Sequence, residues 1–153
     1  MISEFDREWA FLSNFYESEF EYEGITYPTN EHFFQAMKSL DPDERKAIAN
    51  ALTPDKAKWM GRRVVLRPDW EEVKVDIMRE GLYRKFADEQ LADWLLETGD
   101  EILVEGNYWH DNFYGSCFCK KCSAKRGGKP GENMLGKLLM EVRSAIKEER
   151  GLV

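Results

Sequence analysis

The sequence predicts a mainly α-helical protein of the α+β class, an orthogonal helical bundle with a small β-hairpin or sheet. Three observations support this class. Several segments repeat apolar residues at helical spacing, most clearly over about 132–148. One pair of short alternating segments surrounds a glycine turn at Glu23-Gly24. The chain has 153 residues, of which 42% are hydrophobic, so one domain over residues 1–153 can enclose a single core.

The hairpin is expected within a region that begins as an irregular loop at residue 11. Aromatic and β-branched residues flank the turn on both sides, and Gly24 supplies its positive φ angle. Pro28 then stops strand pairing, because it has no amide proton to donate. Thr29 or Asn30 is a suitable N-cap for a helix over about 30–39.

That helix is expected to have two different faces. Residues of the first face are apolar and should join the core: Phe33, Ala36, Met37 and Leu40. The second face presents a carboxylate, a ring, an amide and an ammonium in a row: Glu31, Phe34, Gln35 and Lys38. Glu31 falls in the first turn, where the helix dipole favours the ionised form of a carboxyl group. It is therefore better suited to be a base or to stabilise a cation than to donate a proton.

Most of the remaining chain also predicts helices. Shorter ones are expected at about 43–51, 54–62 and 88–97, and a longer one opens at 67–70 and runs to about residue 86. A short strand is expected over Ile102–Val104. Gly136 lies inside the last helix, where glycine costs about 1 kcal/mol relative to alanine. Such a glycine indicates close approach by another backbone segment or a ligand.

The segment Glu105–Gly115 is the most unusual part of the chain. Its eleven residues include two carboxylates, two carboxamides, four aromatic rings, a histidine and two glycines. Buried helices do not tolerate so many polar groups without partners, and solvated loops seldom carry so many rings. Rings mixed with convergent polar groups are typical of a small-molecule pocket.

Carboxylates suggest what chemistry such a pocket performs. Glu105 and Asp111 flank Trp109, and Glu31 lies on an earlier helix. Two carboxylates at a sugar-bearing site are the usual equipment for cleaving a glycosidic bond through a cationic transition state. The alternative for each carboxylate is a helix cap or a surface charge.

The three cysteines lie together, and His110 precedes them. Cys117, Cys119 and Cys122 with His110 form a chemically reasonable Cys₃His zinc set. The usual pair of CxxC motifs is absent, however, and only one gap has the two-residue spacing. We expect no metal and free thiols, with zinc at these four residues as the alternative.

A basic, glycine-rich stretch covers residues 120–131. Its lysines could hold a phosphate, together with backbone N–H groups of Gly131–Asn133 at the start of the last helix. A flexible solvated loop is the alternative.

Net charge and the length of apolar runs limit the classes of partner and the cellular locations that the sequence allows. A formal charge of −7 argues against a general duplex-DNA binder. We expect no secretory leader, because the first residues lack a basic stretch followed by apolar ones, and no apolar run reaches membrane-spanning length. Reduced cysteines and these absences favour a cytoplasmic protein without membrane association.

Motifs distributed over about residues 5–146 resemble the NADAR (YbiA-like) family. They occur in the same order along almost the whole chain: residues 11–16, 24–36, 61–62, 67–70, 78–86, 95–99, 105–115 and 131–140. Many members have tryptophan where this chain has Tyr114, so the substrate wall is expected to differ there. The Cys117–Cys122 cluster is not part of the general pattern.

The resemblance implies a mainly helical single domain and an N-glycosidase, a hydrolase acting on ribosylated bases. The substrates it implies are phosphoribosylamino-pyrimidine intermediates of riboflavin synthesis, or ADP-ribose attached to guanine in a nucleotide or nucleic acid. The family's acidic and aromatic site residues fall on Glu31, Trp70 and Asp111. Asn14 and Phe15 match a loop that lines the pocket, and Lys38 matches a lysine of the helix motif.

We therefore expect catalysis from Glu31 and Asp111, with Lys38 as a candidate nucleophile at an opened ribose. No cofactor is expected. The residues expected to contact substrate are Asn14, Phe15, Gln35, Arg62, Trp70, Glu105, Asn107, Trp109, Asn112, Tyr114 and Asn133. Two rival hypotheses are a non-catalytic ADP-ribose or nucleotide-binding module and a small zinc-containing interaction domain.

Overall fold

The computed structural model describes residues 1–152 and confirms the α+β class. Two compact units make up the chain. Unit 1 combines Met1–Ser13 with the chain from Asp88 onward, and unit 2 is Asn14–Ala87. The prediction of one domain over residues 1–153 stays a prediction, and each unit is described by itself.

Unit 2 begins with the predicted hairpin. Strands β1 (Glu17–Tyr22) and β2 (Ile25–Thr29) pair antiparallel, with Tyr22 opposite Ile25. Both turn residues have positive φ angles, 50° at Glu23 and 83° at Gly24. This is the conformation of a two-residue hairpin turn, for which glycine is favoured because it has no Cβ.

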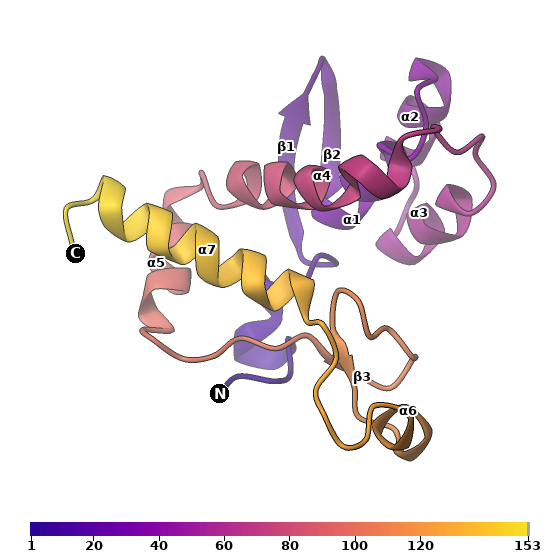
Figure 1. The fold of residues 1–153 in the computed structure, drawn as a ribbon. Coiled ribbons are helices and arrows are strands. Elements are labelled where there is room, and N and C mark those ends of the chain that lie inside the picture. Colours follow the sequence, from indigo (N-terminus) through magenta and orange to yellow (C-terminus); the bar gives the residue numbers. More distant parts are fainter. Residues whose placement is uncertain (153) are drawn as a thin grey trace. The chain divides into compact units, whose positions relative to one another are not determined.

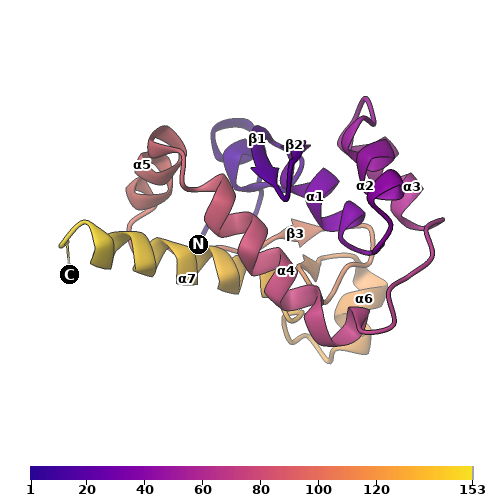
Figure 2. The same ribbon diagram turned by 90° about the horizontal axis from the view of Figure 1, so that it is seen from above.

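Helix α1 (Asn30–Ala36) follows at once and is buried along its whole length. Thr29 is the N-cap, since its hydroxyl accepts the N–H of His32 at 3.1 Å. The hairpin lies on one side of α1 and the pair α2 (Pro42–Ala49) and α3 (Pro54–Gly61) on the other (Figures 1 and 2). Helix α4 (Trp70–Lys85) also packs against α1. The second face of α1 is therefore held inside the unit and is not a solvated surface.

One core expectation on this segment is wrong. Phe33, Ala36 and Met37 are buried, but Leu40 is 59% exposed. Helix α1 ends at Ala36, so the helical spacing that placed Leu40 on the apolar face no longer applies there.

Unit 1 is organised around α7 (Met134–Glu149), whose predicted apolar stripe is buried. Helix α5 (Glu89–Glu97) lies beside the C-terminal half of α7, and α6 (Lys120–Lys125) lies near its N-terminal end (Figures 1 and 2). The other elements are a 3-10 helix η1 (Arg7–Leu12) and two short parallel strands, β3 (Gly106–Asn107) and β4 (Ser116–Cys117). None of the helices in residues 1–152 is long and apolar enough to span a membrane.

Two sequence expectations differ from the structure of unit 1. The strand expected at Ile102–Val104 is reduced to one parallel bridge between Leu103 and Ile2, because the backbone hydrogen bonds to the N-terminal segment are both made by Ile2, to Ile102 and from Val104. The stretch expected to be a loop at residues 120–131 contains α6, which is capped by the Sγ atom of Cys119 accepting the N–H of Cys122. A cysteine cap is not among the usual helix-start signals.

Candidate functional site

Glu31 lies in the first turn of α1, where only 8% of its surface is exposed. Its backbone N–H donates to the carbonyl of Asn14 at 3.0 Å, and its Oε2 accepts from Nε2 of Gln35 at 3.0 Å. Gln35 is one helical turn later, so the two side chains meet on the same face. The carboxylate is thus fixed in position by groups from its own helix and from the preceding loop.

Asn14 connects that loop to the start of α1. Its Oδ1 accepts from Nδ2 of Asn30 at 2.9 Å, and its own Nδ2 lies 3.4 Å from the sulfur of Met78. Phe15, the next residue, is 38% exposed. The loop expected to line a pocket is therefore anchored beside Glu31, and its contact with substrate stays a prediction.

Gln35 is buried, with 4% exposure, and faces Gly61. A Cβ atom at Gly61 would overlap the Oε1 atom of Gln35, so only glycine leaves room for this amide. Oε1 has no hydrogen-bond partner within residues 1–152. A buried acceptor of this kind costs about 1–3 kcal/mol unless it is satisfied, which makes the Gln35 amide a candidate ligand contact.

Lys38 and Trp70 extend the same side of unit 2. The Nζ of Lys38 lies 5.9 Å from the centre of the Trp70 ring, within the range of a cation–π contact. Trp70 is 7% exposed and packs on Phe34 with ring centres 5.1 Å apart. Arg62 is exposed at the C-cap of α3, and its positive charge repels the ammonium group of Lys38.

Burial lowers the pKa of Lys38 below the ordinary lysine value of 10.5. The positive charges of Arg62 and Lys58 lower this pKa further, while Glu31 opposes the shift. A lowered pKa increases the neutral fraction of the amine near neutral pH, which a lysine nucleophile needs.

We expect the reactivity of Lys38 toward an amine-modifying reagent to titrate with a midpoint below 10.5. Replacing Glu31 with glutamine removes the group that raises this pKa and should move the midpoint further down. Peptide mass spectrometry of protein labelled at a series of pH values gives the midpoint, and exposed Lys129 provides the internal control for reagent chemistry. An unchanged midpoint in the Glu31→Gln protein would contradict the coupling.

In unit 1, the loop before β4 turns around Asp111. The Oδ1 of Asp111 accepts the N–H of Phe113 at 3.1 Å and that of Tyr114 at 3.0 Å. Such a side-chain-to-backbone turn orients the carboxylate relative to the loop. Asp111 is half-buried, and Trp109 before it is 59% exposed.

Asn107 holds this loop from inside. It is 1% exposed, and its Oδ1 accepts the N–H groups of Trp109 and Asp111 at 3.2 and 3.1 Å. Its Nδ2 donates to the carbonyls of Asp111 at 2.8 Å and Glu105 at 3.3 Å. These four bonds use both N–H donors and both lone pairs of the amide, and all four partners are backbone groups, which makes Asn107 a positioning residue.

The other two carboxamides of unit 1 that were expected to contact substrate also bind backbone. Asn112 Oδ1 accepts the N–H of Cys117 at 2.9 Å and a guanidinium N–H of Arg126. Asn133, with a left-handed φ of 52°, accepts the N–H of Glu105 at 2.9 Å and donates to the carbonyl of Leu103 at 2.8 Å. Substrate contact by these amides stays a prediction. In the structure their hydrogen bonds hold the backbone of the Glu105–Gly115 segment and its neighbours in place.

Glu105 and Tyr114 lie at the two ends of the loop, and both are partly buried. The carbonyl of Glu105 accepts the N–H of Ser116 at 2.9 Å, which closes the loop next to Gly115. The ring of Tyr114 packs edge-on against Phe113 with centres 4.8 Å apart. The ring of Tyr114 is therefore held in place by the neighbouring ring of Phe113.

The backbone N–H groups considered as phosphate donors at the start of α7 are already occupied. These groups donate to the Asp111–Gly115 loop instead: Glu132 to Asn112, Asn133 to Gly115, Met134 to Phe113 and Leu135 to Tyr114, at 2.8 to 3.1 Å. Gly131 donates to the hydroxyl of Ser116 at 3.0 Å. Because the carbonyls of the loop already occupy the helix N-terminus, no donors of Gly131–Leu135 are left for an anion.

Lys85 was not singled out from the sequence. It is 2% exposed in α4, and its Nζ lies 5.8 Å and 5.3 Å from the ring centres of Tyr16 and Phe86. Its spacing from Met78 and Leu82 puts it on the buried face of the helix, and this spacing was the available signal. A lysine buried this deeply belongs with the candidate functional groups of unit 2.

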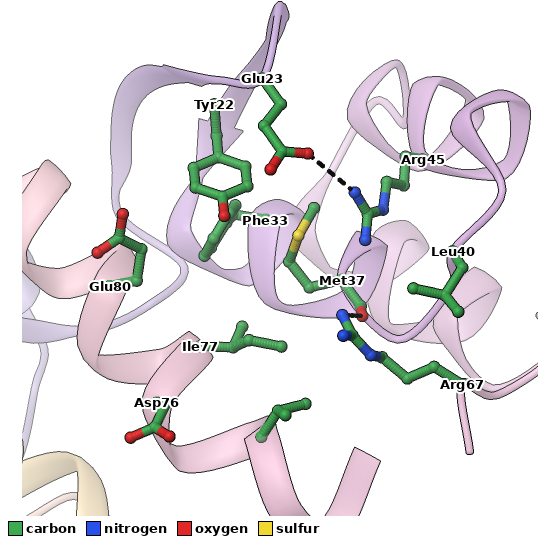
Figure 3. Close-up of a pocket in the computed structure, with 11 residues that line it drawn as sticks. Tyr22, Glu23, Phe33, Met37, Leu40, Arg45, Arg67, Asp76, Ile77 and Glu80 are labelled. Atoms are coloured by element: carbon green, nitrogen blue, oxygen red, sulfur yellow. Dashed lines mark hydrogen bonds and ion pairs between the residues drawn. The ribbon is translucent and has the colours of Figure 1, made fainter. Parts of the chain in front are cut away.

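Unit 2 also contains a cavity of about 550 Å³ between the hairpin, α1 and α4 (Figure 3). Tyr22, Phe33 and Ile77 form part of its wall, and Arg45 on its rim pairs with Glu23 at 3.4 Å. None of the predicted site residues lines it. The cavity is therefore a separate feature of the unit.

These features define a class of protein: an α+β chain with a buried helix-borne glutamate beside an amide, a lysine and a tryptophan, and a second carboxylate in an aromatic loop. The chain belongs to the NADAR domain family, whose family model matches residues 3–147.

Relatives of known name agree with this membership. N-glycosidase YbiA of Escherichia coli is 36% identical over 150 residues, covering 94% of this chain and 85% of that protein. N-glycosidase Npun_R5314 of Nostoc punctiforme is 40% identical over 142 residues, covering 89% and 85%. The chloroplastic riboflavin biosynthesis protein PYRR of Zea mays is 36% identical over 137 residues, but these are 20% of its length and 80% of this chain. The NMR structure of E. coli YbiA superimposes with a TM-score of 0.80 at 35% identity, covering 97% of this chain and 86% of that one.

Proposed function

We propose that the protein is an N-glycosidase that hydrolyses the bond between ribose and a base. Membership of the NADAR family and two relatives named N-glycosidases support the reaction class. The observation that carries the proposal is Glu31, a buried carboxylate held by Gln35 with Lys38 and Trp70 close by.

The reaction needs groups that stabilise positive charge on the sugar. The bond from C1′ to the base nitrogen breaks and its electron pair leaves with the base, so that the ribosyl group becomes cationic. A water oxygen then bonds to C1′, the water loses a proton, and the base nitrogen gains one. Glu31 is proposed to stabilise the cation, because a carboxylate inside a low-dielectric environment interacts strongly with a developing positive charge.

Trp70 and Lys38 fit supporting roles beside Glu31. The Trp70 ring, packed on Phe34, offers a rigid apolar wall for a base or a sugar face. Lys38 is proposed as the nucleophile of a variant mechanism. Its neutral amine bonds to C1′ of the opened ribose, the bond from C1′ to the base nitrogen breaks, and the base leaves with a proton from the amine. Water then hydrolyses the Schiff base between Lys38 and the sugar and frees the lysine.

Asp111 is proposed as the second carboxylate, which positions the attacking water or a proton for the leaving base. Asp111 belongs to unit 1 and Glu31 to unit 2, so the contribution of Asp111 is tested by a separate single substitution. Its fixed orientation through Phe113 and Tyr114 supports this role, since a positioned acid or base is what proton transfer requires.

Two substrate classes follow from the relatives and the family. The riboflavin protein of Zea mays supports phosphoribosylamino-pyrimidines. ADP-ribose attached to guanine, in a nucleotide or in nucleic acid, is the second class. A cytoplasmic location remains part of the proposal. A protein that binds ADP-ribose without cleaving any N-glycosidic bond is the rival outcome.

The experiment is a screen of both substrate classes for release of free base, run with wild type and Asp111→Asn. Wild type is expected to release base, and Asp111→Asn to lower kcat by about 100-fold. An asparagine Oδ1 still accepts the N–H groups of Phe113 and Tyr114, so the loop keeps its turn while the charge is lost.

Asp100→Asn, at an exposed position of the same unit, is the matched control and should stay within twofold of wild type. Tight calorimetric binding of ADP-ribose with no base released from any substrate would identify a binding module instead. Full activity in Asp111→Asn would remove Asp111 from the mechanism.

A further inference from the structure

We propose that unit 1 contains a structural zinc site formed by His110, Cys117, Cys119 and Cys122. One ligand atom from each residue, the imidazole nitrogen and three thiol sulfurs, lies within 4.8 Å of every other. All three cysteines are free of disulfides. Three thiols and an imidazole that converge on one point form a Cys₃His set, one of the standard structural zinc sites.

The spacing of these atoms fits a tetrahedral ion. Bond lengths of about 2.3 Å to sulfur and about 2.0 Å to nitrogen imply N···S separations of about 3.5 Å. The Nδ1 of His110 lies 3.3 Å from Sγ of Cys122, 3.5 Å from Sγ of Cys119 and 3.8 Å from Sγ of Cys117. Ordinary packing of one imidazole does not require three sulfurs at these distances.

Local structure brings each ligand to the cluster from a different direction. His110 has a left-handed φ of 71°, and Asn107 holds the backbone on both sides of it. Cys117 is in β4, Cys119 is the N-cap of α6, and Cys122 lies in the first turn of that helix. A non-glycine residue in the left-handed region is uncommon and costs energy, which bonding of its ring to a metal would offset.

The charges around the cluster are also suitable. Three thiolates with one Zn²⁺ leave a net charge of −1. Basic residues follow immediately in α6 (Lys120–Lys125), and Arg126 donates to the carbonyl of Cys117 at 2.9 Å. The basic stretch that was considered as a phosphate site thus lies next to the proposed anionic metal centre.

If Asp111 acts in the proposed N-glycosidase reaction, the zinc site would also affect the position of this carboxylate. His110 precedes Asp111, so a metal bonded to His110 ties the Asp111 loop to β4 and α6. Zinc is therefore expected to set the position of this loop and not to activate water, because a closed four-ligand site has no open coordination position.

The test uses the full-length chain purified without an affinity tag under reducing conditions. Elemental analysis should find about one zinc per chain. Replacing zinc with Co²⁺ should produce the thiolate-to-metal charge-transfer band and the intense d–d bands of tetrahedral cobalt. Cys122→Ser should weaken zinc binding by about 100-fold or more, since even outer-shell changes cost about 10–100-fold. Ser123→Ala, the neighbouring position in α6, is the control and should bind as wild type does.

The cobalt spectrum is measured on the wild-type chain, so the test does not depend on the variants folding. No stoichiometric zinc, or an octahedral cobalt spectrum without sulfur charge transfer, would overturn the proposal. Activity is scored separately. A zinc-loaded chain that cleaves no ribosylated base would refute only the proposed function, and an active chain that binds no zinc would refute only this site.

Discussion

Glu31→Gln is expected to lower kcat for base release by about 10²–10³-fold while the protein stays folded. Glutamine has nearly the same volume, and its carbonyl oxygen can accept the same hydrogen bond from Gln35. The substitution removes the negative charge at a position that is 8% exposed, so the loss of charge stabilisation is not compensated by water. Stability should stay equal or rise, because a buried charge no longer has to be desolvated.

Glu71→Gln is the matched control for this prediction. Glu71 is also the second residue of its helix, but its side chain is 77% exposed and pairs with Lys74 on the surface. Steady-state kinetics and thermal unfolding are measured on both proteins. If Glu31→Gln keeps kcat/KM within twofold of wild type, Glu31 does not stabilise the transition state.

Gly136→Ala is expected to destabilise the protein by about 2–3 kcal/mol, although alanine is the better helix former. A Cβ atom at this position would overlap the carbonyl oxygen of Leu103 and the amide of Asn133. Overpacking costs about 1–3 kcal/mol, and displacing Leu103 also breaks the bond from Asn133 Nδ2 to its carbonyl, worth about 1 kcal/mol. The gain in helix propensity is only about 1 kcal/mol, so the clash decides the sign.

Urea unfolding followed by circular dichroism gives this free energy of unfolding. Ser144→Ala, at an exposed position of the same helix, is the control and should change stability by no more than about 0.5 kcal/mol. A Gly136→Ala protein as stable as wild type would show that the segment around Leu103 can move away at little cost.

Features that depend on neighbours in sequence could be predicted from the sequence alone. The turn at Gly24 follows from the conformational freedom of one residue, and the buried stripe of α7 follows from helical periodicity. The first-turn position of Glu31 and its meeting with Gln35 follow from the same helical geometry. Gly136 was correctly interpreted as a point of close backbone approach, but its neighbour could not be named.

Tertiary structure decided which polar groups are available for chemistry. Asn107, Asn112 and Asn133 were expected to contact substrate, which stays a prediction, and the structure adds that their amides bind backbone. The N–H groups at the start of α7 looked like an anion site, and the Asp111–Gly115 loop occupies them. A polar group has a limited number of donors and acceptors, and the backbone groups that use them come from chain segments whose distance in space is not encoded in local spacing.

The cysteine cluster shows most clearly what the sequence determines and what only the tertiary structure decides. The sequence by itself determined the family, the helical class and the candidate residues, because these depend on residue identity and short-range periodicity. Only the tertiary structure brought His110 to the three sulfurs, because a positive φ angle and the clamp by Asn107 turn the loop toward β4 and α6. Metal sites are recognised by the convergence of ligand atoms, and convergence is a property of the folded backbone and not of the order of residues along it.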